Sequence, residues 1–296
     1  MKTLIKLLLP IALFVSCEEQ KAVQVLATTS VVADAARQLL PPEVEVTALM
    51  QSNIDPHSYK PVERDVHKIH SAKIVLHNGL HLEGKMTEIL EKVSLDKPVY
   101  AMSDPLKSSE LIRVGPNVFD PHIWFDLKLW ESCAKGLAIF LMEQFPEHRA
   151  EIQKRSNAYS AKLLNTHNSF YQKTNEVPDS LRAMITAHDA FSYFGKAYGI
   201  EVKGLQGIST AAEFGVKDMS SAANFILETG LNTVFTETSV NSKSIEALKE
   251  AVEQKGGAVR LGKPLYSDAL GEKGTPEASL IGAFEFNTTQ ILNSWK

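Results

Sequence analysis

The chain has 296 residues, enough for two domains of ordinary size, and its 44% hydrophobic and 22% charged residues are typical of a globular protein. The formal net charge is −4, and no basic cluster is interleaved with aromatic residues, so the composition argues against a nucleic-acid partner. Of the two cysteines, Cys133 lies in a segment with helical spacing and is expected to be a buried thiol.

The first seventeen residues have the layout of an export signal. Lys2 and Lys6 precede an apolar run at 7–15 that is too short to span a bilayer. Cys17 follows directly and resembles the lipidated cysteine of a bacterial lipobox. We therefore expect a signal peptide at 1–16 and a lipid anchor on Cys17, which would hold an exported protein to a membrane, in the periplasm or at the cell surface. The alternative is a buried apolar segment with an incidental cysteine.

Short apolar runs alternate with segments of helical spacing along the rest of the chain. In the first half they predict strands at 23–29, 44–49 and 74–77 and helices at 31–40, 61–72 and 126–145. In the second half they predict strands at 182–186, 201–205, 233–236 and 258–261 and helices at 189–198, 217–229, 242–255 and 276–292. Such alternation indicates an α/β fold with parallel sheets.

The segment between these halves is polar, permits helix, and contains no glycine or proline from Glu147 to about Glu176. It predicts one helix of about 30 residues, roughly 45 Å long, which would be a stiff connector. Its histidines, His148 and His167, are expected to be exposed. The predicted organisation is an N-terminal lobe at 22–145, a connecting helix at 146–177 and a C-terminal lobe at 178–296.

One tripeptide occurs twice, as Asp55-Pro56-His57 and as Asp120-Pro121-His122. In each copy the proline restricts the backbone before the histidine, on a loop that precedes a predicted helix. This suits a metal ligand whose direction must be fixed before the ion arrives. For an isolated histidine, a loop residue bonded to the backbone would be the simpler interpretation; the duplication favours ligands.

The second half offers two further candidates. His188 follows a predicted strand, with Asp189 placed to cap the next helix, and open α/β sheets bind ligands at this carboxyl edge. The loop after the last predicted strand could bring Asp268 to the same edge. Together with His57 and His122 these residues would form a site of three imidazoles and one carboxylate, suited to Zn²⁺ or, if the carboxylate is bidentate, to Mn²⁺.

Four protein ligands would leave little room for a reactive water, so carriage of the ion fits better than catalysis. Other histidines occur at helix-compatible spacings, in the pairs His67 and His70 and His77 and His81, but their surroundings favour structural roles.

Several segments of the chain resemble the TroA-like family of zinc and manganese ABC-importer binding lipoproteins, over almost the whole chain after the signal. The segments that carry this resemblance are Asp55-Pro56-His57-Ser58-Tyr59-Lys60-Pro61, Asn78-Gly79-Leu80-His81-Leu82-Glu83-Gly84-Lys85-Met86, Asp120-Pro121-His122-Ile123-Trp124-Phe125-Asp126, Thr186-Ala187-His188-Asp189-Ala190-Phe191 and Gly207-Ile208-Ser209-Thr210-Ala211-Ala212-Glu213.

The resemblance implies two similar (β/α)₄-like lobes joined by one long rigid helix, with the metal between them held by His57, His122, His188 and Asp268. It implies a monomeric carrier, not an enzyme, that serves the permease and ATPase of an ABC importer. Histidine rather than glutamate at 188 favours Zn²⁺, whereas the absence of a long histidine-rich loop before Asp55 leaves Mn²⁺ open.

Three acidic residues, Asp55, Asp120 and Glu213, are expected to accept hydrogen bonds from the ligand imidazoles and to fix their tautomers. Two other functions stay open at this point: a metal-dependent hydrolase, and a surface adhesin, a role sometimes proposed for this family.

Overall fold

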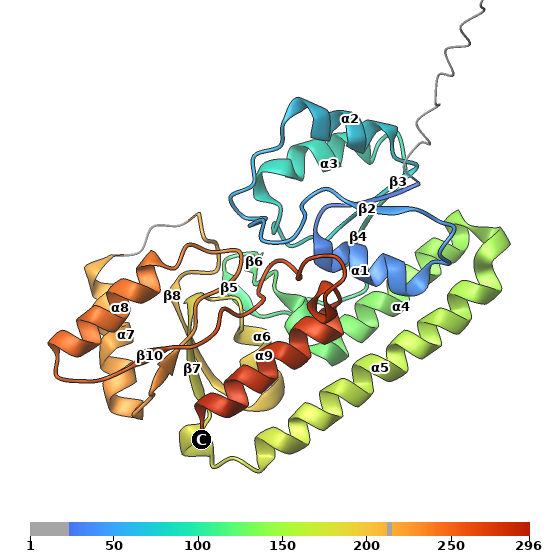
Figure 1. Cartoon of the computed structure of the whole chain (residues 1–296). Coiled ribbons are helices and arrows are strands. Elements are labelled where there is room, and N and C mark those ends of the chain that lie inside the picture. Colours follow the sequence, from blue (N-terminus) through green and yellow to red (C-terminus); the bar gives the residue numbers. More distant parts are fainter. Residues whose placement is uncertain (1–23, 212–214) are drawn as a thin grey trace, which may run out of the picture.

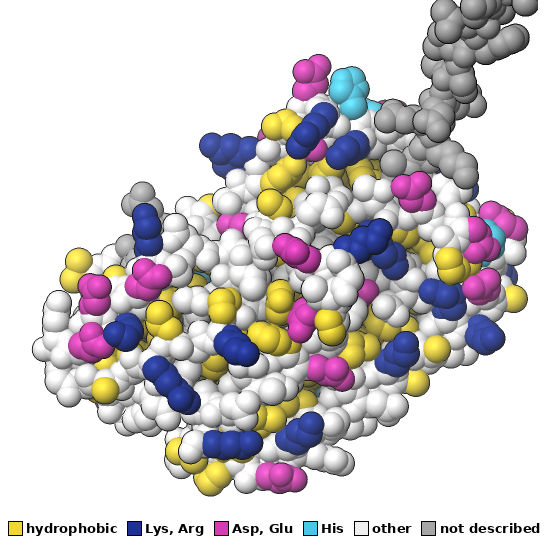
Figure 2. All heavy atoms as spheres, viewed as in Figure 1, with side chains coloured by type: hydrophobic (Ala, Val, Ile, Leu, Met, Phe, Trp, Pro, Cys, Tyr) yellow, Lys and Arg dark blue, Asp and Glu magenta, His cyan; other side chains and the backbone are white. Residues whose placement is uncertain are grey.

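A computed structural model describes residues 24–211 and 215–296. The expected signal peptide at 1–16, the lipidation site Cys17, and Glu213 lie outside the described residues. Within the described ranges, no helix combines the length and the apolar character needed to cross a membrane. On the face shown in Figure 2, Lys and Arg side chains are interspersed with Asp and Glu, so this face has no concentrated field of one sign.

The N-terminal lobe is built on a parallel four-stranded sheet in the order β2-β1-β3-β4. Its strands are β1 (Val25–Ala27), β2 (Val46–Ala48), β3 (Ile74–His77) and β4 (Val99–Ala101). Helices α1 (Ser30–Leu39), α2 (Glu63–Ser71) and α3 (Thr87–Val93) accompany the sheet, and a hairpin of β5 (Arg113–Gly115) and β6 (Val118–Phe119) follows it. The central strands β1 and β3 are buried on both faces, which explains their apolar runs, whereas the edge strands β2 and β4 are partly exposed.

Helix α1 begins where the sequence predicts, because the side chain of Thr29 accepts a hydrogen bond from the backbone N–H of Val32. Its small and β-branched residues, such as Val31 and Ala35, are fully buried against the sheet. The helix ends at Leu39, just before two consecutive prolines, which cannot continue it.

Two long helices lie where the lobes meet, α4 (Leu127–Gln144) and the 27-residue α5 (Arg149–Asn175). Helix α5 runs along both lobes in Figure 1. This confirms the predicted long connecting helix. The predicted exposure of its two histidines is wrong: His167 is buried, with Nδ1 3.0 Å from the hydroxyl of Tyr198, and the side chain of His148 is only 24% exposed. The reason is that α5 is packed rather than free-standing, with buried residues at intervals of three to four along one face.

The C-terminal lobe contains two parallel strand pairs, β7 (Ala183–His188) with β8 (Glu201–Gln206), and β9 (Thr233–Val234) with β10 (Arg260–Leu261). A hydrogen bond from the N–H of Phe235 to the carbonyl of Ile185 joins the pairs side by side. The accompanying helices are α6 (Ser192–Tyr198), α7 (Val216–Thr229), α8 (Lys243–Gln254) and α9 (Leu280–Ser294).

The expectation that Asp189 caps the next helix is wrong. Helix α6 begins at Ser192 after Phe191, because the chain first makes a tight turn, closed by a bond from the N–H of Ala190 to the carbonyl of His188. Asp189 instead accepts a hydrogen bond from the hydroxyl of Ser192 at 2.7 Å.

One hydrophobic cluster extends across both lobes, and each lobe has a smaller cluster of its own. Buried side chains from the first sheet and from α4, such as Val25 and Trp130, belong to the same cluster as Phe191, Tyr198 and Phe284 from the second lobe. Because protein interiors pack like solids, a shared core restrains movement of one lobe against the other. The fold thus favours small shifts near the interface over wide hinge closure.

Polar contacts also tie α1 to the C-terminal lobe. A carboxylate oxygen of buried Asp34 accepts a hydrogen bond from the N–H of Leu280, the first residue of α9, at 3.0 Å, and the other oxygen accepts one from Gln38 at 3.1 Å. The hydroxyl of Ser30 accepts a hydrogen bond from the N–H of Leu270 at 2.9 Å.

We expect the substitution Asp34→Ala to lower the free energy of unfolding by about 1–3 kcal/mol, because it leaves the buried N–H of Leu280 without an acceptor. Urea unfolding followed by circular dichroism measures the change. The matched control is Asp179→Ala, whose side chain is 92% exposed beside Arg182 and whose removal should change the stability by less than about 0.5 kcal/mol. Equal effects of the two substitutions would contradict the tie between α1 and α9.

Candidate metal centre

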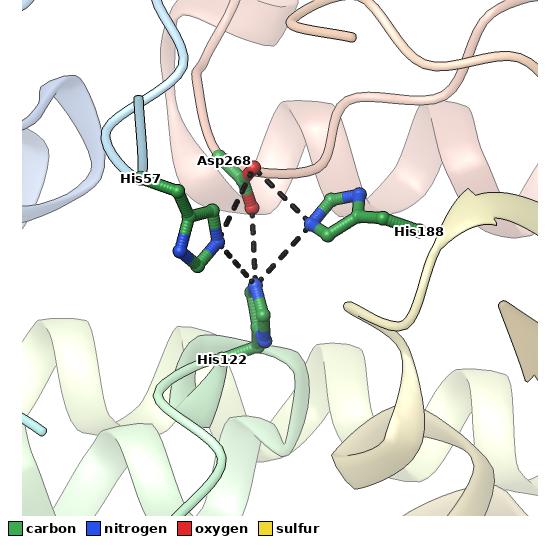
Figure 3. A group of neighbouring side chains, drawn as sticks. All are labelled: His57, His122, His188 and Asp268. Atoms are coloured by element: carbon green, nitrogen blue, oxygen red, sulfur yellow. Dashed lines mark hydrogen bonds and ion pairs between the residues drawn. The ribbon is translucent and has the colours of Figure 1, made fainter. Parts of the chain in front are cut away.

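Four side chains converge between the lobes, one from each of four separate segments (Figure 3). His57 lies in the loop between β2 and α2, and His122 lies between β6 and α4. His188 is the last residue of β7, and Asp268 lies in the loop between β10 and α9. The structure therefore brings together all four residues that the sequence singles out as metal ligands.

Both copies of the repeated tripeptide fold into the same local turn. In the first copy, a carboxylate oxygen of Asp55 accepts a hydrogen bond from the N–H of His57 at 2.9 Å, and in the second Asp120 does the same for His122, also at 2.9 Å. This short-range bond is the usual turn of an aspartate with the backbone two residues on. It fixes the direction in which each histidine leaves the chain.

The donor atoms of the four side chains all lie within 4.8 Å of one another. The Nε2 atom of His122 is 3.1 Å from Nε2 of His57, 3.4 Å from Nε2 of His188 and 3.4 Å from Oδ1 of Asp268. Oδ2 of Asp268 is 3.3 Å from Nε2 of His188 and 3.9 Å from Nε2 of His57. Four donors about 2.0–2.1 Å from a zinc ion at tetrahedral angles would be roughly 3.3 Å apart. The arrangement therefore has the size of a mononuclear metal site.

The four side chains differ in their access to solvent. His122 and His188 are 0% exposed and Asp268 is 1% exposed, whereas His57 is 7% exposed. Three donors are thus sealed inside the interface, and His57 is the one nearest to solvent.

Carboxylates hold two of the three imidazoles through the ring nitrogen that faces away from the centre. Oδ1 of Asp120 is 2.7 Å from Nδ1 of His122, as expected from the sequence. Glu237 contacts His188 as an ion pair, with Oε2 2.6 Å from Nδ1 but not in hydrogen-bond alignment, and its other oxygen accepts the N–H of His188 at 2.9 Å. Such partners fix the tautomer that presents Nε2 to a metal.

Of the three acidic residues expected to accept hydrogen bonds from the ligand imidazoles, only Asp120 does so in the described part of the chain. Asp55 bonds to the backbone of His57 instead, and Glu213 lies outside the described residues. The sequence analysis missed Glu237. Its position directly after the predicted strand at 233–236, at the carboxyl edge where His188 also lies, is the signal that could have found it.

The charges at the centre are set by these neighbours. Burial opposes protonation of His122, but Asp120 and Asp268 raise its pKa to about 9. Burial also opposes protonation of His188, yet Glu237 and Asp268 raise its pKa well above the usual value. Burial opposes ionisation of Asp268, whereas the imidazoles of His188 and His122 hold its pKa well below the usual range. The neighbouring carboxylates therefore favour the protonated form of His122 and of His188.

His57 behaves differently, because burial lowers its pKa to about 4 and leaves it neutral at physiological pH.

Among the described residues, no other group of three or more histidine, cysteine or acidic side chains brings its ligand atoms within 4.8 Å of one another. His67 and His77 each have only a single acidic partner, 3.8 Å and 3.9 Å away.

A buried centre of three imidazoles and one carboxylate between two α/β lobes defines a class of two-lobed metal-binding proteins. The chain belongs to the family described as zinc-uptake complex component A, periplasmic, whose profile matches residues 25–294. The family and the structure agree with the resemblance inferred from the sequence motifs.

Known relatives are similar over most of their length. The chain is 39% identical over 274 residues to the manganese-binding lipoprotein MntA of Bacillus subtilis, covering 92% of this chain and 90% of that protein. It is 38% identical over 268 residues to the zinc-binding protein TroA of Treponema pallidum, covering 90% of this chain and 87% of that protein. The solved structure of periplasmic TroA superimposes with a TM-score of 0.90, at 38% identity, over 92% of this chain and 98% of that one.

We expect Glu237→Gln to weaken zinc binding by about 10- to 100-fold, because the amide can still meet the N–H of His188 but no longer supplies a charge beside its ring. Competition with a fluorescent chelator measures the affinity. Glu253→Gln on α8, where the carboxylate pairs only with exposed Lys249, is the matched control and should leave the affinity unchanged. Wild-type affinity in Glu237→Gln would exclude the proposed role of this carboxylate.

We expect zinc affinity to rise with pH from about pH 5.5 to about pH 8, at least tenfold per pH unit. The raised pKa values of His122 and His188 mean that an arriving ion must displace protons, and fewer protons are bound as the pH rises. Because carboxylates keep at least one of the two rings protonated near neutral pH, at least one proton should leave per ion. Calorimetry in buffers of different ionisation enthalpy counts these protons, and a count of zero would contradict this charge assignment.

Proposed function

We propose that this chain is an exported lipoprotein that captures Zn²⁺ or Mn²⁺ outside the cytoplasmic membrane and delivers it to an ABC importer. The observation that carries the proposal is the set of four buried donors from His57, His122, His188 and Asp268 with the spacing of a single metal ion. Family membership adds the transport context, since the family is that of a periplasmic zinc-uptake component.

Zn²⁺ is the preferred cargo in this proposal. Three imidazoles and one carboxylate, with ligand atoms within 4.8 Å of one another, suit zinc, which is almost always four-coordinate when protein side chains fill its site. Both oxygens of Asp268 face imidazole nitrogens, so a bidentate carboxylate is also open to the site and would suit Mn²⁺. The names of the relatives include both metals, which keeps manganese as the second cargo.

Carriage rather than catalysis follows from the number of protein donors. A catalytic zinc site usually keeps three protein ligands and one open position for water. Here the fourth position is supplied by Asp268, which is 1% exposed, so a substrate has no direct access to an ion from that side. We therefore propose that the protein is not an enzyme, and we do not favour the metal-dependent hydrolase.

The remaining parts of the proposal concern location and partners. Cys17 would carry the lipid after removal of residues 1–16, holding the protein at a membrane in the periplasm or at the cell surface. The partners would be the permease and ATPase of the importer, with the protein acting as a monomer. The lobes would extend over 22–145 and 178–296, joined by 146–177.

We expect one zinc ion per chain in protein purified without added metal, and loss of that ion in His122→Ala and Asp268→Ala, because each removes a central donor. Elemental analysis by mass spectrometry measures the content, followed by competition between zinc and manganese. His67→Ala, which removes a 78%-exposed imidazole, should keep the ion. Full zinc content in both centre variants, or hydrolytic turnover by the zinc-loaded protein, would contradict the proposal.

A further inference from the structure

The carboxylate of Asp55 joins the two lobes beside the metal centre. Its Oδ1 accepts the N–H of His57, while its Oδ2 accepts hydrogen bonds from the hydroxyl of Ser58 at 2.7 Å and from that of Thr210 at 2.6 Å. Thr210 belongs to the C-terminal lobe, 155 positions along the chain. One side chain thus connects the loop that presents His57 to the opposite lobe.

From this connection we infer that Thr210 is a positioning residue for His57, and that the Asp55–Thr210 bond is the gate through which the ion enters and leaves. The inference rests on the proposed function, since it needs an ion at the centre. It means that the ion is exchanged on one side of the interface between the lobes. It also means that His57 is the first ligand to leave the ion.

A cavity of about 740 Å³ marks this side of the interface. Its wall in the N-terminal lobe includes Asp55 and Tyr59, and its wall in the C-terminal lobe includes Thr210, Ser239 and Asn241. The bond between Asp55 and Thr210 therefore joins the two walls of this cavity. Asp55 and Ser58, on either side of His57 in its loop, both line this cavity.

Of the three histidines, His57 has the ring with the fewest restraints. Asp120 and Glu237 hold His122 and His188 through their Nδ1 atoms, at 2.7 Å and 2.6 Å. Within the described residues, no hydrogen bond or ion pair reaches Nδ1 of His57. Its position depends on the backbone of its loop, and that loop is held to the other lobe by Thr210 through Asp55.

Loss of the Thr210 hydroxyl would free this loop without disturbing its internal turn. Asp55 would still accept the N–H of His57 and the hydroxyl of Ser58, so His57 would swing out with its loop as a unit. His122 and His188 would stay in place, held by carboxylates within their own lobes. The ion would then be bound by three donors and open to water, which is the state from which it dissociates.

The test compares Thr210→Val, which keeps the shape and removes the hydroxyl, with Thr210→Ser, which keeps the hydroxyl. We expect the zinc dissociation rate, measured by stopped flow with excess chelator, to rise at least about tenfold in Thr210→Val, the lower end for one hydrogen bond to a charged acceptor. Thr210→Ser should return the rate to within about twofold of the wild type.

Thr238→Val is the matched control. Thr238 lies in the same lobe, but its buried hydroxyl has no hydrogen-bond partner among the described residues, so the same chemical change removes no contact. An unchanged dissociation rate in Thr210→Val, or an equal increase in Thr238→Val, would overturn the gate. Failure of the wild type to bind zinc at all would instead overturn the proposed function, so the two failures are distinguishable.

Discussion

The structure depends on the mutual approach of four buried donor groups. The nitrogen and oxygen atoms of His57, His122, His188 and Asp268 face one another within 4.8 Å, at a depth where water cannot screen them. Lone pairs held this close repel unless a positive charge lies among them. A divalent cation satisfies all four donors at once, and protons on the imidazoles are the substitute when it is absent.

The rest of the fold keeps these donors in place. Turns formed by Asp55 and Asp120 aim two of the histidines, and Glu237 aims the third. The shared core and α5 hold the two lobes at a fixed separation, so the centre is largely preformed. In such a frame only a loop has to move to exchange the ion, and the loop of His57 has the weakest support.

The sequence predicted the parts of the site that repeat or follow local rules. The duplicated tripeptide identified His57 and His122, and strand patterns placed His188 at a sheet edge. Contacts between segments far apart in the chain could not be predicted from the sequence. Glu237 lies opposite His188 because β9 packs beside β7, and His167 is buried because α5 packs against both lobes. The sequence analysis also did not predict the short elements α3, β4 and the β5–β6 hairpin, because they contain too few residues for a clear periodicity.

X-ray absorption at the zinc edge of the loaded protein tests the coordination most directly. The account predicts a first shell of only nitrogen and oxygen at about 2.0–2.1 Å, with the outer-shell pattern of three imidazoles. A sulfur neighbour at about 2.3 Å, which in this chain would point to Cys133 or Cys17, would contradict it. So would a shell with fewer than three imidazoles.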